Sequence, residues 1–380
     1  MYIINVFIVY LFSGNHLPLL PLLRYTYLNV LMEVIIMANM KDIAERAGVS
    51  VTTVSKVLNH QGNISAETAK QIRDIAKELN YIPNLYARNL KMGKSRVLGI
   101  ITEDLTVFNA APVIDGIGAR CEEAGYHYIL ENLRINQLKI DPETHTDEYN
   151  AIVSEAMDFM KSMQVDGVIF LGCHSHHVMS LPEINHTKFV CAYCSSDSPA
   201  IPAVMYDDRQ AGYDVATYLI QNGHRKIGVL AGPLHSIHTV NRLDGYQEAL
   251  FDNQLPYNPH LTVYGDWERD SGFHLAGGLL SQKVTAIFCQ NDVMAMGVMD
   301  YCSRNGITVG RDLSLIGFDD RDIASVCRPA LSTVSLPLYE IGHKAADLLM
   351  KRIAGEDDPN LTEVLLPCKI VIRESSSVLK

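Results

Sequence analysis

Apolar positions recur at helical spacing over residues 40–80 and give way to short continuous apolar runs after residue 96. In the first region, apolar side chains three and four positions apart predict three short helices. Gly48 and Ser50 lie between the first two, where a left-handed residue can end one helix and a hydroxyl can cap the next. Ser65 is the predicted N-cap of the third helix. The pattern therefore predicts a small helical module with a tight turn between its first two helices.

From residue 97 onwards, short apolar runs alternate with helical stretches in two consecutive series, which predicts two parallel-sheet lobes. The second series includes a predicted helix over Arg242–Asp252, and a tail, Ser332–Lys380, is expected to cross back between the lobes. Ligands of such sheets sit at the carboxyl ends of the strands, so the expected site is the cleft between the lobes. The expected strands are Val97–Thr102, Tyr126–Asn132, Gly167–Leu171, Lys188–Tyr193, Ala203–Tyr206, Lys226–Leu230, Leu261–Tyr264, Val284–Cys289 and Leu313–Phe318.

The second predicted helix of the N-terminal module has one polar face. Because Val54 and Val57 turn inward, the opposite face carries Val51, Thr52, Ser55 and Lys56. Small side chains and one cation near a helix N-terminus suit insertion into the major groove of DNA. On this pattern alone, a small helical bundle that binds nothing is the alternative.

One stretch resembles the DNA-binding headpiece of the lactose-repressor (LacI/GalR) family almost without gaps: Asp42-Ile-Ala-Glu-Arg-Ala-Gly-Val-Ser-Val-Thr-Thr-Val-Ser-Lys-Val-Leu-Asn59. The resemblance continues through Tyr81-Ile-Pro-Asn84 and covers all but the first 36 residues. It implies an α/β fold class, with an N-terminal all-α helix-turn-helix headpiece and a two-lobed, periplasmic-binding-protein-like α/β effector domain. It assigns headpiece contacts with DNA to Ser50, Val51, Thr52, Thr53, Ser55, Lys56 and Asn59.

The resemblance also divides the chain into segments. Family headpieces begin one to a few residues before the first helix, which matches a start at Met37 or Met40. The apolar runs before that point are shorter than the ~20 residues that a membrane helix needs; a membrane-tethered regulator is the alternative. The expected domains are 1–36, a non-native N-terminal extension; 37–82, the headpiece; 83–96, a hinge helix and linker; and 97–380, the effector-binding and dimerisation domain.

The predicted hinge is about two turns long, which is too short for a stable helix in water. In the resembled family this segment becomes helical only when two copies meet on DNA, and a leucine corresponding to Leu90 wedges between base pairs in the minor groove. The alternative is a simple linker. The resemblance assigns DNA contacts in this segment to Asn84, Tyr86, Ala87 and Leu90.

Charge is distributed unevenly along the 380 residues, whose net charge is −11. Residues 37–97 hold ten Lys and Arg against five Asp and Glu, a net +5, whereas residues 98–380 carry −16. A small basic module on a large acidic body is expected if only the module contacts phosphate. The overall acidity therefore does not argue against binding to nucleic acid.

Several residues at predicted strand ends match effector-contacting positions of the resembled family. Arg242 corresponds to an arginine that hydrogen-bonds ligand hydroxyls, and its planar fork of donors suits neighbouring oxygens. Asn291 and Asp292 end one predicted strand, and Asp319 ends the next. The alternatives are that Arg242 pairs with a carboxylate and that Asp319 is a structural acceptor.

Two aromatic residues complete the predicted effector site. Trp267, the only tryptophan of the chain, matches a family tryptophan that stacks on the apolar face of a sugar ring. Phe108 is expected to line the other lobe. The alternative for Trp267 is simple packing. Together the six residues favour a polar small molecule, and the combination of an aromatic ring, a carboxylate and an arginine favours a carbohydrate.

The cysteine and histidine motifs are interpreted structurally. Cys191-Ala-Tyr-Cys194 lies in an apolar run, which favours buried free thiols over redox or metal use. Cys173-His-Ser-His-His177 follows a predicted strand, which favours a polar loop over a metal cluster. His224, Asp319 and Asp320 could serve as acid and base, but no nucleophile elbow, phosphate loop or zinc motif accompanies them. We therefore expect no catalytic residues, no metal and no cofactor.

The sequence predicts a cytoplasmic, homodimeric transcriptional repressor that makes no membrane contact. It is expected to bind a near-palindromic double-stranded DNA operator, because each headpiece of a two-fold dimer reads one half-site. The expected effector is a small molecule, a carbohydrate, in the interlobe cleft. The alternatives are a solute receptor of the periplasmic type and a regulator whose effector is a purine, a nucleoside or a phosphoprotein.

Overall fold

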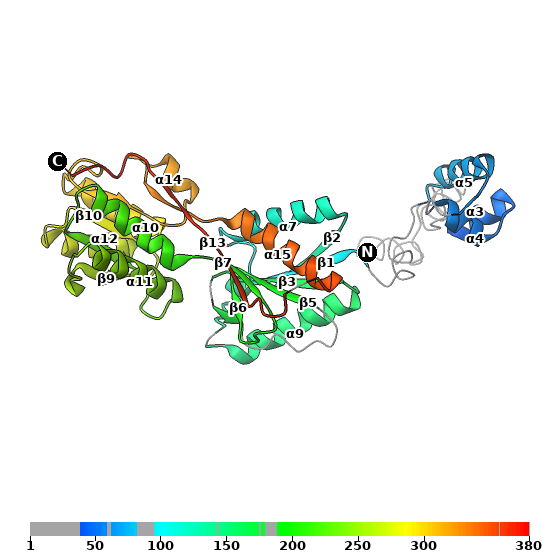
Figure 1. Cartoon of the computed structure of the whole chain (residues 1–380), viewed down its shortest axis with the longest axis horizontal. Coiled ribbons are helices and arrows are strands. Elements are labelled where there is room, and N and C mark those ends of the chain that lie inside the picture. The colour runs from blue at the N-terminus through cyan, green and yellow to red at the C-terminus, as the bar shows by residue number, and fades with distance from the viewer. Residues whose placement is uncertain are drawn as a thin grey trace, which may run out of the picture. The chain divides into compact units, whose positions relative to one another are not determined.

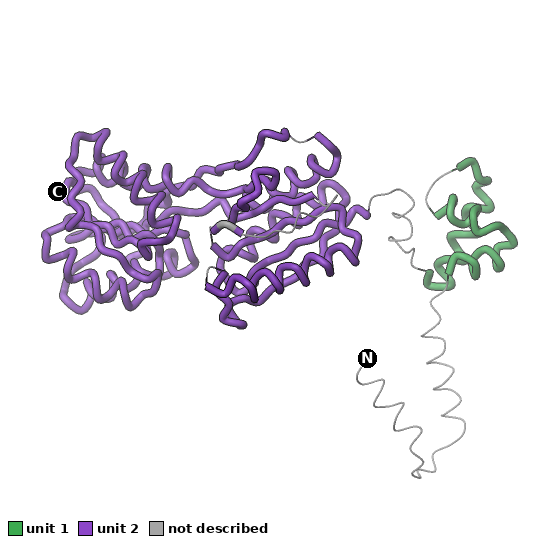
Figure 2. The backbone as a smooth tube through the Cα atoms, turned by 90° about the horizontal axis from the view of Figure 1, so that it is seen from below, with its two compact units in different colours: residues 1–93 green, residues 94–380 purple. Residues whose placement is uncertain are grey.

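The computed structural model describes residues 39–58, 62–81, 95–142, 144–174, 176–178, 188–356 and 358–379. The chain falls into two compact units, residues 1–93 and 94–380 (Figure 2). The expected N-terminal extension and hinge helix lie outside the described residues. Among the residues that are described, no helix has both the length and the apolar character needed to cross a membrane.

The described part of the first unit contains three helices around a small apolar core (Figure 1). Gly48 follows the first helix with φ +64°, the left-handed conformation predicted for it. The Ser65 side chain accepts a hydrogen bond from the backbone N–H of Thr68, as an N-cap does. Asn39 and Asp42 form a capping box that the sequence analysis overlooked. The helices are α3 (Met40–Ala47), α4 (Val51–Leu58) and α5 (Ala66–Glu78).

The second unit begins with a lobe built on a six-stranded, wholly parallel sheet, which we call the first lobe. Its strand order is β13-β7-β5-β3-β1-β2. The strands are β1 (Val97–Thr102), β2 (His127–Asn132), β3 (Gly167–Leu171), β5 (Lys188–Ala192), β7 (Ala203–Tyr206) and β13 (Glu363–Leu366), and a short pair is formed by β4 (His177–Val178) and β6 (Ser195–Ser196). The helices are α7 (Ala110–Ala124), α8 (Ile135–Leu138), α9 (Thr146–Ser162) and α15 (Leu338–Ala354).

Successive side chains of the buried strands pack on opposite faces of this sheet. Leu98 and Ile100 belong to the core beneath α7 and α15, whereas Ile101 belongs to the core beneath α9. Figure 1 shows α7 and α15 together on one side of the sheet and α9 on the other. Coverage of both faces explains why the strands read as continuous apolar runs in the sequence.

The second lobe has a four-stranded parallel sheet in the order β11-β10-β8-β9. The predicted α/β fold with two parallel-sheet lobes is therefore confirmed. The strands are β8 (Ile227–Ala231), β9 (Thr262–Tyr264), β10 (Ala286–Cys289) and β11 (Ser314–Ile316). The helices are α10 (Asp208–Gln221), α11 (Ile237–Asp252), α12 (Arg269–Ser281), α13 (Asp292–Arg304), α14 (Asp322–Val326) and the short η1 (Pro259–Leu261). Helix α11 begins before Arg242, the residue at which the sequence analysis placed its start.

The C-terminal tail crosses between the lobes, as predicted. Strand β13 joins the first-lobe sheet, and the chain then forms β14 (Lys369–Val371), which pairs antiparallel with β12 (Thr333–Ser335). At its end, the N–H of Leu379 donates to the carbonyl of Asn222 in the second lobe at 2.9 Å. Buried His224, with its Nε2 3.1 Å from the Ser377 carbonyl oxygen, anchors this tail.

Three pairs of helices cross at glycines, where their backbones touch. A Cβ on Gly116 of α7 would lie 2.0 Å from the Tyr339 carbonyl oxygen, and one on Gly342 of α15 would lie 1.8 Å from the Val113 carbonyl oxygen. The same arrangement joins α10 to α11 and α12 to α13, through Gly212, Gly245, Gly272 and Gly297. Any side chain at these positions would push the paired helices apart.

We expect Gly342→Ala to destabilise the protein by ~1–3 kcal/mol, because the added methyl group overpacks a rigid backbone contact. Gly278→Ala is the matched control: Gly278 lies in α12 and nothing approaches its Cβ position within 4 Å. That change should be neutral or stabilising by ~0.5–1 kcal/mol, since alanine is the better helix former. The free energy of urea unfolding measures both effects. A Gly342→Ala variant as stable as the wild type would contradict the inference that the helix crossing requires glycine at this position.

Candidate functional site

Helix α4 presents the face that the sequence analysis assigned to DNA. Val51, Thr52 and Lys56 are exposed, while Val54 and Val57 are buried beneath them. Thr53 and Ser55 are half-buried at the edge of the same face. The residues Asn59, Asn84, Tyr86, Ala87 and Leu90, which were also assigned to DNA, lie outside the described residues.

The start of α4 is fixed by two hydroxyl groups. The backbone N–H of Thr53 donates to Ser50 Oγ at 3.1 Å, and the two side-chain oxygens lie 2.9 Å apart. Lys56 runs past Gly62, whose Cβ position is 3.3 Å from the lysine Cδ. The helix therefore offers an ordered N-terminal turn and a cation whose stem packs against the neighbouring loop.

In the second unit, Arg242 is buried at the junction of the two lobes. Its Nε donates to Asp208 Oδ1 at 2.6 Å, and its Nη2 donates to the Tyr206 hydroxyl of the first lobe at 2.9 Å. Its Nη1 donates to the carbonyl of Gln290, and its Cζ lies 3.6 Å from the centroid of the Phe318 ring. Arg242 therefore pairs with a carboxylate, which was the alternative to a ligand-binding role in the sequence-based prediction. These hydrogen bonds use three of its five N–H donors.

The Asp208 carboxylate joins Arg242 to a wider polar network that the sequence analysis missed. His238 Nδ1 lies 2.6 Å from Asp208 Oδ2 and 3.0 Å from the Tyr206 hydroxyl. Burial opposes ionisation of Asp208, but Arg242 and His238 together lower its pKa. Burial raises the pKa of Tyr206 well above its ordinary value. No local motif marked these residues, because His238 and Arg242 lie thirty and thirty-four positions from Asp208.

Asn291 and Asp292 both support the second lobe. Asn291 caps α13 by accepting from the N–H of Met294 at 2.8 Å, and its amide donates to the carbonyl of Trp267 at 2.9 Å. Asp292 is fully buried; its two oxygens accept from the Thr333 hydroxyl at 2.6 Å and from the Arg321 N–H at 2.8 Å. The Asp292 carboxylate therefore fixes the loop after β11 and has a positioning role toward the junction.

Asp319 lies in that loop with φ +109°, a conformation that is rare for a residue with a side chain. Its N–H donates to the carbonyl of Val334 at 2.9 Å. Burial raises the pKa of Asp319 to about 8, although Arg242 opposes the shift. At neutral pH this carboxyl group keeps its proton, so it can both donate and accept hydrogen bonds.

The two predicted aromatic residues lie on opposite lobes. A Cβ on Gly232, at the end of β8, would lie 2.1 Å from Cζ2 of Trp267, so the indole covers a strand end that only glycine permits. The Trp267 ring centroid is 5.8 Å from Cζ of Arg242. Across the junction, the ring centroid of Phe108 in the first lobe lies 4.6 Å from Cζ of Arg321.

Several buried side-chain atoms have no hydrogen-bond partner in the described part of the chain. Among them are Oδ1 of Asn109, which follows Phe108, and Oγ1 of Thr239, in the first turn of α11. Buried polar atoms left unpaired in this way are costly, and they call for an explanation. Neither residue was singled out by the sequence.

Comparison with known proteins agrees with this architecture. Residues 39–84 match the family model described as "Bacterial regulatory proteins, lacI family", and residues 216–376 match that of a periplasmic binding protein-like domain. The HTH-type transcriptional repressor CytR of Escherichia coli (strain K12) is 31% identical over 345 residues, which are 90% of this chain and 97% of CytR. The chain belongs to the LacI family.

Two solved structures of transcriptional regulators have similar folds. The Lac repressor dimer bound to operator and the anti-inducer ONPF has a TM-score of 0.72 and 26% sequence identity, covering 90% of this chain and 99% of that one. The complex of the transcriptional regulator CelR with cellobiose has a TM-score of 0.58 and 25% identity, covering 89% and 99%. As a LacI-family member, this protein is a DNA-binding transcriptional regulator and is not an enzyme.

The raised pKa of Asp319 predicts a pH dependence of stability for this LacI-family protein. The unfolded chain releases the proton near its ordinary pKa of 3.8, and the folded protein releases it near 8. The wild type therefore loses stability as the pH rises between these values. Asn cannot ionise, so the stability of Asp319→Asn relative to wild type should rise from about pH 4 to about pH 8 and then level off.

Urea unfolding at several pH values measures this difference. Asp312→Asn is a control of opposite sign, because hydrogen bonding to Arg311 lowers the pKa of Asp312. The amount by which Asp312→Asn is less stable than the wild type should decrease as the pH is lowered. A pH-independent difference between Asp319→Asn and the wild type would show that the carboxyl group ionises normally.

Proposed function

We propose that this LacI-family regulator is a repressor that binds a near-palindromic operator as a homodimer and takes a carbohydrate effector at the junction of its two lobes. The observation that carries the effector assignment is the gathering of Trp267 and Asp319 around Arg242 at the junction. The family membership supports the DNA-binding half of the proposal.

The exposed face of α4 is the proposed base-reading surface. Val51 and Thr52 are small enough to approach base edges and methyl groups, and Lys56 can donate to guanine or to phosphate. Arg46 and Glu78 lie 3.5 Å apart and link α3 to α5 behind this face. An isolated ion pair this exposed contributes little stability, so the buried core must hold the helices in place.

A face of the second lobe supports the homodimer. Helices α13 and α14 border a hollow of about 880 Å³ whose lining includes Met296, Met299 and Cys327. Val326, beside it, has 64% of its surface exposed. Apolar surface of this kind is typical of an interface. The Lac repressor, which shares this fold, is a dimer on its operator, and we propose the same two-fold assembly here.

The chemistry of the lobe junction supports a neutral ligand that carries hydroxyl groups. The Trp267 indole supplies an apolar ring face, the two remaining Arg242 donors suit ligand oxygens, and protonated Asp319 can pair with a hydroxyl in either direction. CelR, whose fold is similar, holds cellobiose.

Contacts across the junction explain how an effector would act. The first lobe touches the second through Phe108 and Arg321, and through Tyr206 and Arg242. A ligand bound among these residues changes the relation between the lobes if it fits one arrangement better than another. Regulation is then the difference in its affinity for the DNA-competent and DNA-incompetent states.

Lys56→Ala tests the DNA interface. With an operator selected by the wild-type protein from random duplexes, we expect the variant to lose ~1–3 kcal/mol of binding free energy, through loss of a base-edge contact. Lys70→Ala is the charge-matched control, because Lys70 is exposed on α5. Equal weakening on selected and random duplexes would limit Lys56 to phosphate contact. A full-length protein that ignores DNA even at low salt would overturn the proposal.

A titration that follows Trp267 fluorescence tests the effector site. Among mono- and disaccharides, with purines and nucleosides as controls, we expect one sugar to give a saturable change, because Trp267 is the sole tryptophan. Asp319→Asn should weaken that affinity by about tenfold or more while operator binding persists, whereas Asp312→Asn should leave both unchanged. A response confined to purines or nucleosides would overturn the carbohydrate assignment, and silence throughout would overturn the site.

A further inference from the structure

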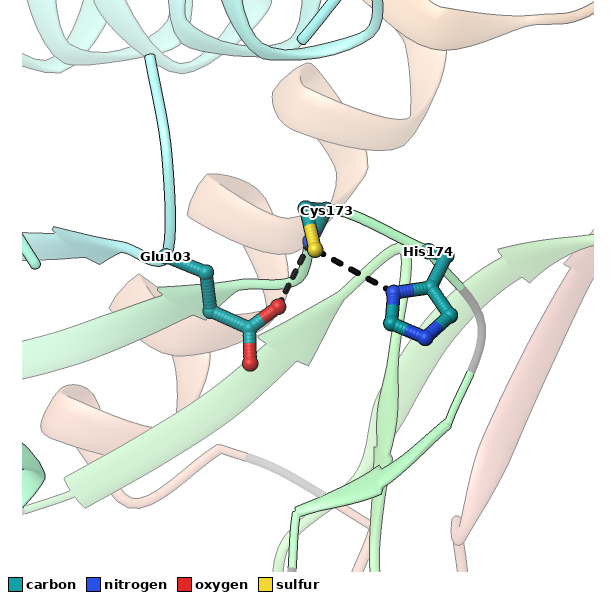
Figure 3. A group of neighbouring side chains, drawn as sticks. All are labelled: Glu103, Cys173 and His174. Atoms are coloured by element: carbon teal, nitrogen blue, oxygen red, sulfur yellow. Dashed lines mark hydrogen bonds between the residues drawn. The ribbon is translucent and has the colours of Figure 1, made fainter. Parts of the chain in front are cut away.

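A second group of functional side chains lies in the first lobe, where strands β1 and β3 end. Glu103 follows β1, and Cys173 and His174 belong to the loop after β3. Figure 3 shows the thiol of Cys173 directed at the imidazole of His174, with the Glu103 carboxylate on the other side of the cysteine. The sequence predicted a polar loop at Cys173–His177, because this stretch follows a predicted strand, and nothing local in it indicated that Glu103 lies beside it.

We propose that Glu103, Cys173 and His174 form a binding site for a zinc ion. Each offers one ligand atom, and these three atoms lie within 4.8 Å of one another. Cys173 Sγ is 3.1 Å from His174 Nδ1. In a tetrahedral zinc site, bonds of about 2.3 Å to sulfur and 2.0 Å to nitrogen would place these atoms about 3.5 Å apart. The observed arrangement therefore requires little rearrangement.

The surroundings of Glu103 orient the carboxylate for this role. The Tyr149 hydroxyl donates to Oε1, and His176 Nε2 lies 3.0 Å from the same oxygen. Oε2, the oxygen nearer the cysteine, accepts the backbone N–H of Cys173 at 2.7 Å, and a carboxylate oxygen has a second lone pair with which to bind a cation. Partners of this kind fix a metal-binding carboxylate in most known sites.

The loop that carries the other two residues is also held in place. The Asn109 amide donates to the carbonyl of Gly172 at 3.1 Å. A Cβ on Gly172 would lie 2.6 Å from Cβ of Cys194 and 3.0 Å from the carbonyl oxygen of His174, so only glycine lets the loop turn here. Cys173 and His174 thus follow a constrained residue, and their ligand atoms are pre-positioned.

The kind of cation follows from the donor set. One sulfur, one imidazole nitrogen and one carboxylate oxygen suit a borderline ion such as zinc and disfavour calcium or magnesium, which prefer oxygen alone. Glu103 is fully buried, whereas His174 is exposed, so the side of the site next to the histidine is open to solvent. Three protein ligands with an accessible fourth position are typical of an exchangeable rather than a closed structural zinc site.

Cobalt(II), a spectroscopic substitute for zinc, tests the proposal in the metal-free full-length protein without DNA or sugar. We expect one equivalent to produce a thiolate-to-cobalt absorption band in the near ultraviolet, which zinc then abolishes by displacement. Cys173→Ser should remove the band. Cys327→Ser, which alters a half-buried cysteine of the other lobe, should retain it.

A second variant separates binding from folding. Glu103 is buried in a network whose loss threatens the fold, whereas the His174 side chain is exposed, so His174→Ala should leave the circular dichroism spectrum unchanged. It should lower the cobalt affinity by at least about tenfold. No band in the wild type, an undiminished band in Cys173→Ser, or an unchanged affinity in His174→Ala would each overturn the proposed site. None of these results bears on operator or sugar binding.

Discussion

The buried guanidinium of Arg242 is the constraint on which the junction between the two lobes depends. Only 3% of its surface is exposed, and an unpaired cation in such a place would cost several kcal/mol. The guanidinium is stabilised by the Asp208 carboxylate, the Tyr206 hydroxyl, the Gln290 carbonyl and the face of the Phe318 ring. These partners come from α10, from β7 of the first lobe and from the ends of two second-lobe strands. Satisfying one charge therefore ties together segments of both lobes.

The same pairing sets the electrostatic character of the junction. Asp208 neutralises Arg242, and Asp319 holds its proton at neutral pH because burial raises its pKa to about 8. The Arg242–Asp208 pair and the protonated Asp319 thus supply hydrogen-bonding groups with little net charge, while Arg321, which contacts Phe108 across the junction, adds a cation. The groups around Arg242 are therefore compatible with the proposed neutral ligand that carries hydroxyl groups. The positive φ of Asp319 is consistent with this role, since backbone strain of this kind concentrates at functional sites.

Local signals predicted most of the fold. The strands over Gly167–Leu171 and Ala203–Tyr206 have the predicted limits, because buried parallel strands read as uninterrupted apolar runs. Gly48 and Ser65 marked helix ends through chemistry that acts within a few residues. The start of α11 was missed because its N-cap, Ser236, makes no side-chain capping bond, and its first turn contains the β-branched residues that favour strands.

The candidate site was harder to predict from the sequence than the fold, because its interactions join residues that are far apart in the sequence. The resemblance led to Arg242, Trp267 and Asp319, but not to the pairing of Arg242 with Asp208. A strand-end position alone also proved ambiguous: the Asn291 side chain caps a helix and the Asp292 side chain supports a loop. A residue at the right edge of a sheet can serve the scaffold as well as the ligand, and only its hydrogen-bond partners distinguish the two roles.

Asn109 illustrates how one sheet edge can serve two purposes. Its amide nitrogen donates to the carbonyl of Gly172, next to the proposed zinc ligands, while its amide oxygen has no partner among the described residues. Asn109 directly follows Phe108, which contacts Arg321 of the second lobe. Both candidate sites include residues at the carboxyl ends of first-lobe strands, because that edge gathers loops from several parallel strands. A cation that fixed the Gly172 loop would also fix the orientation of the Asn109 amide.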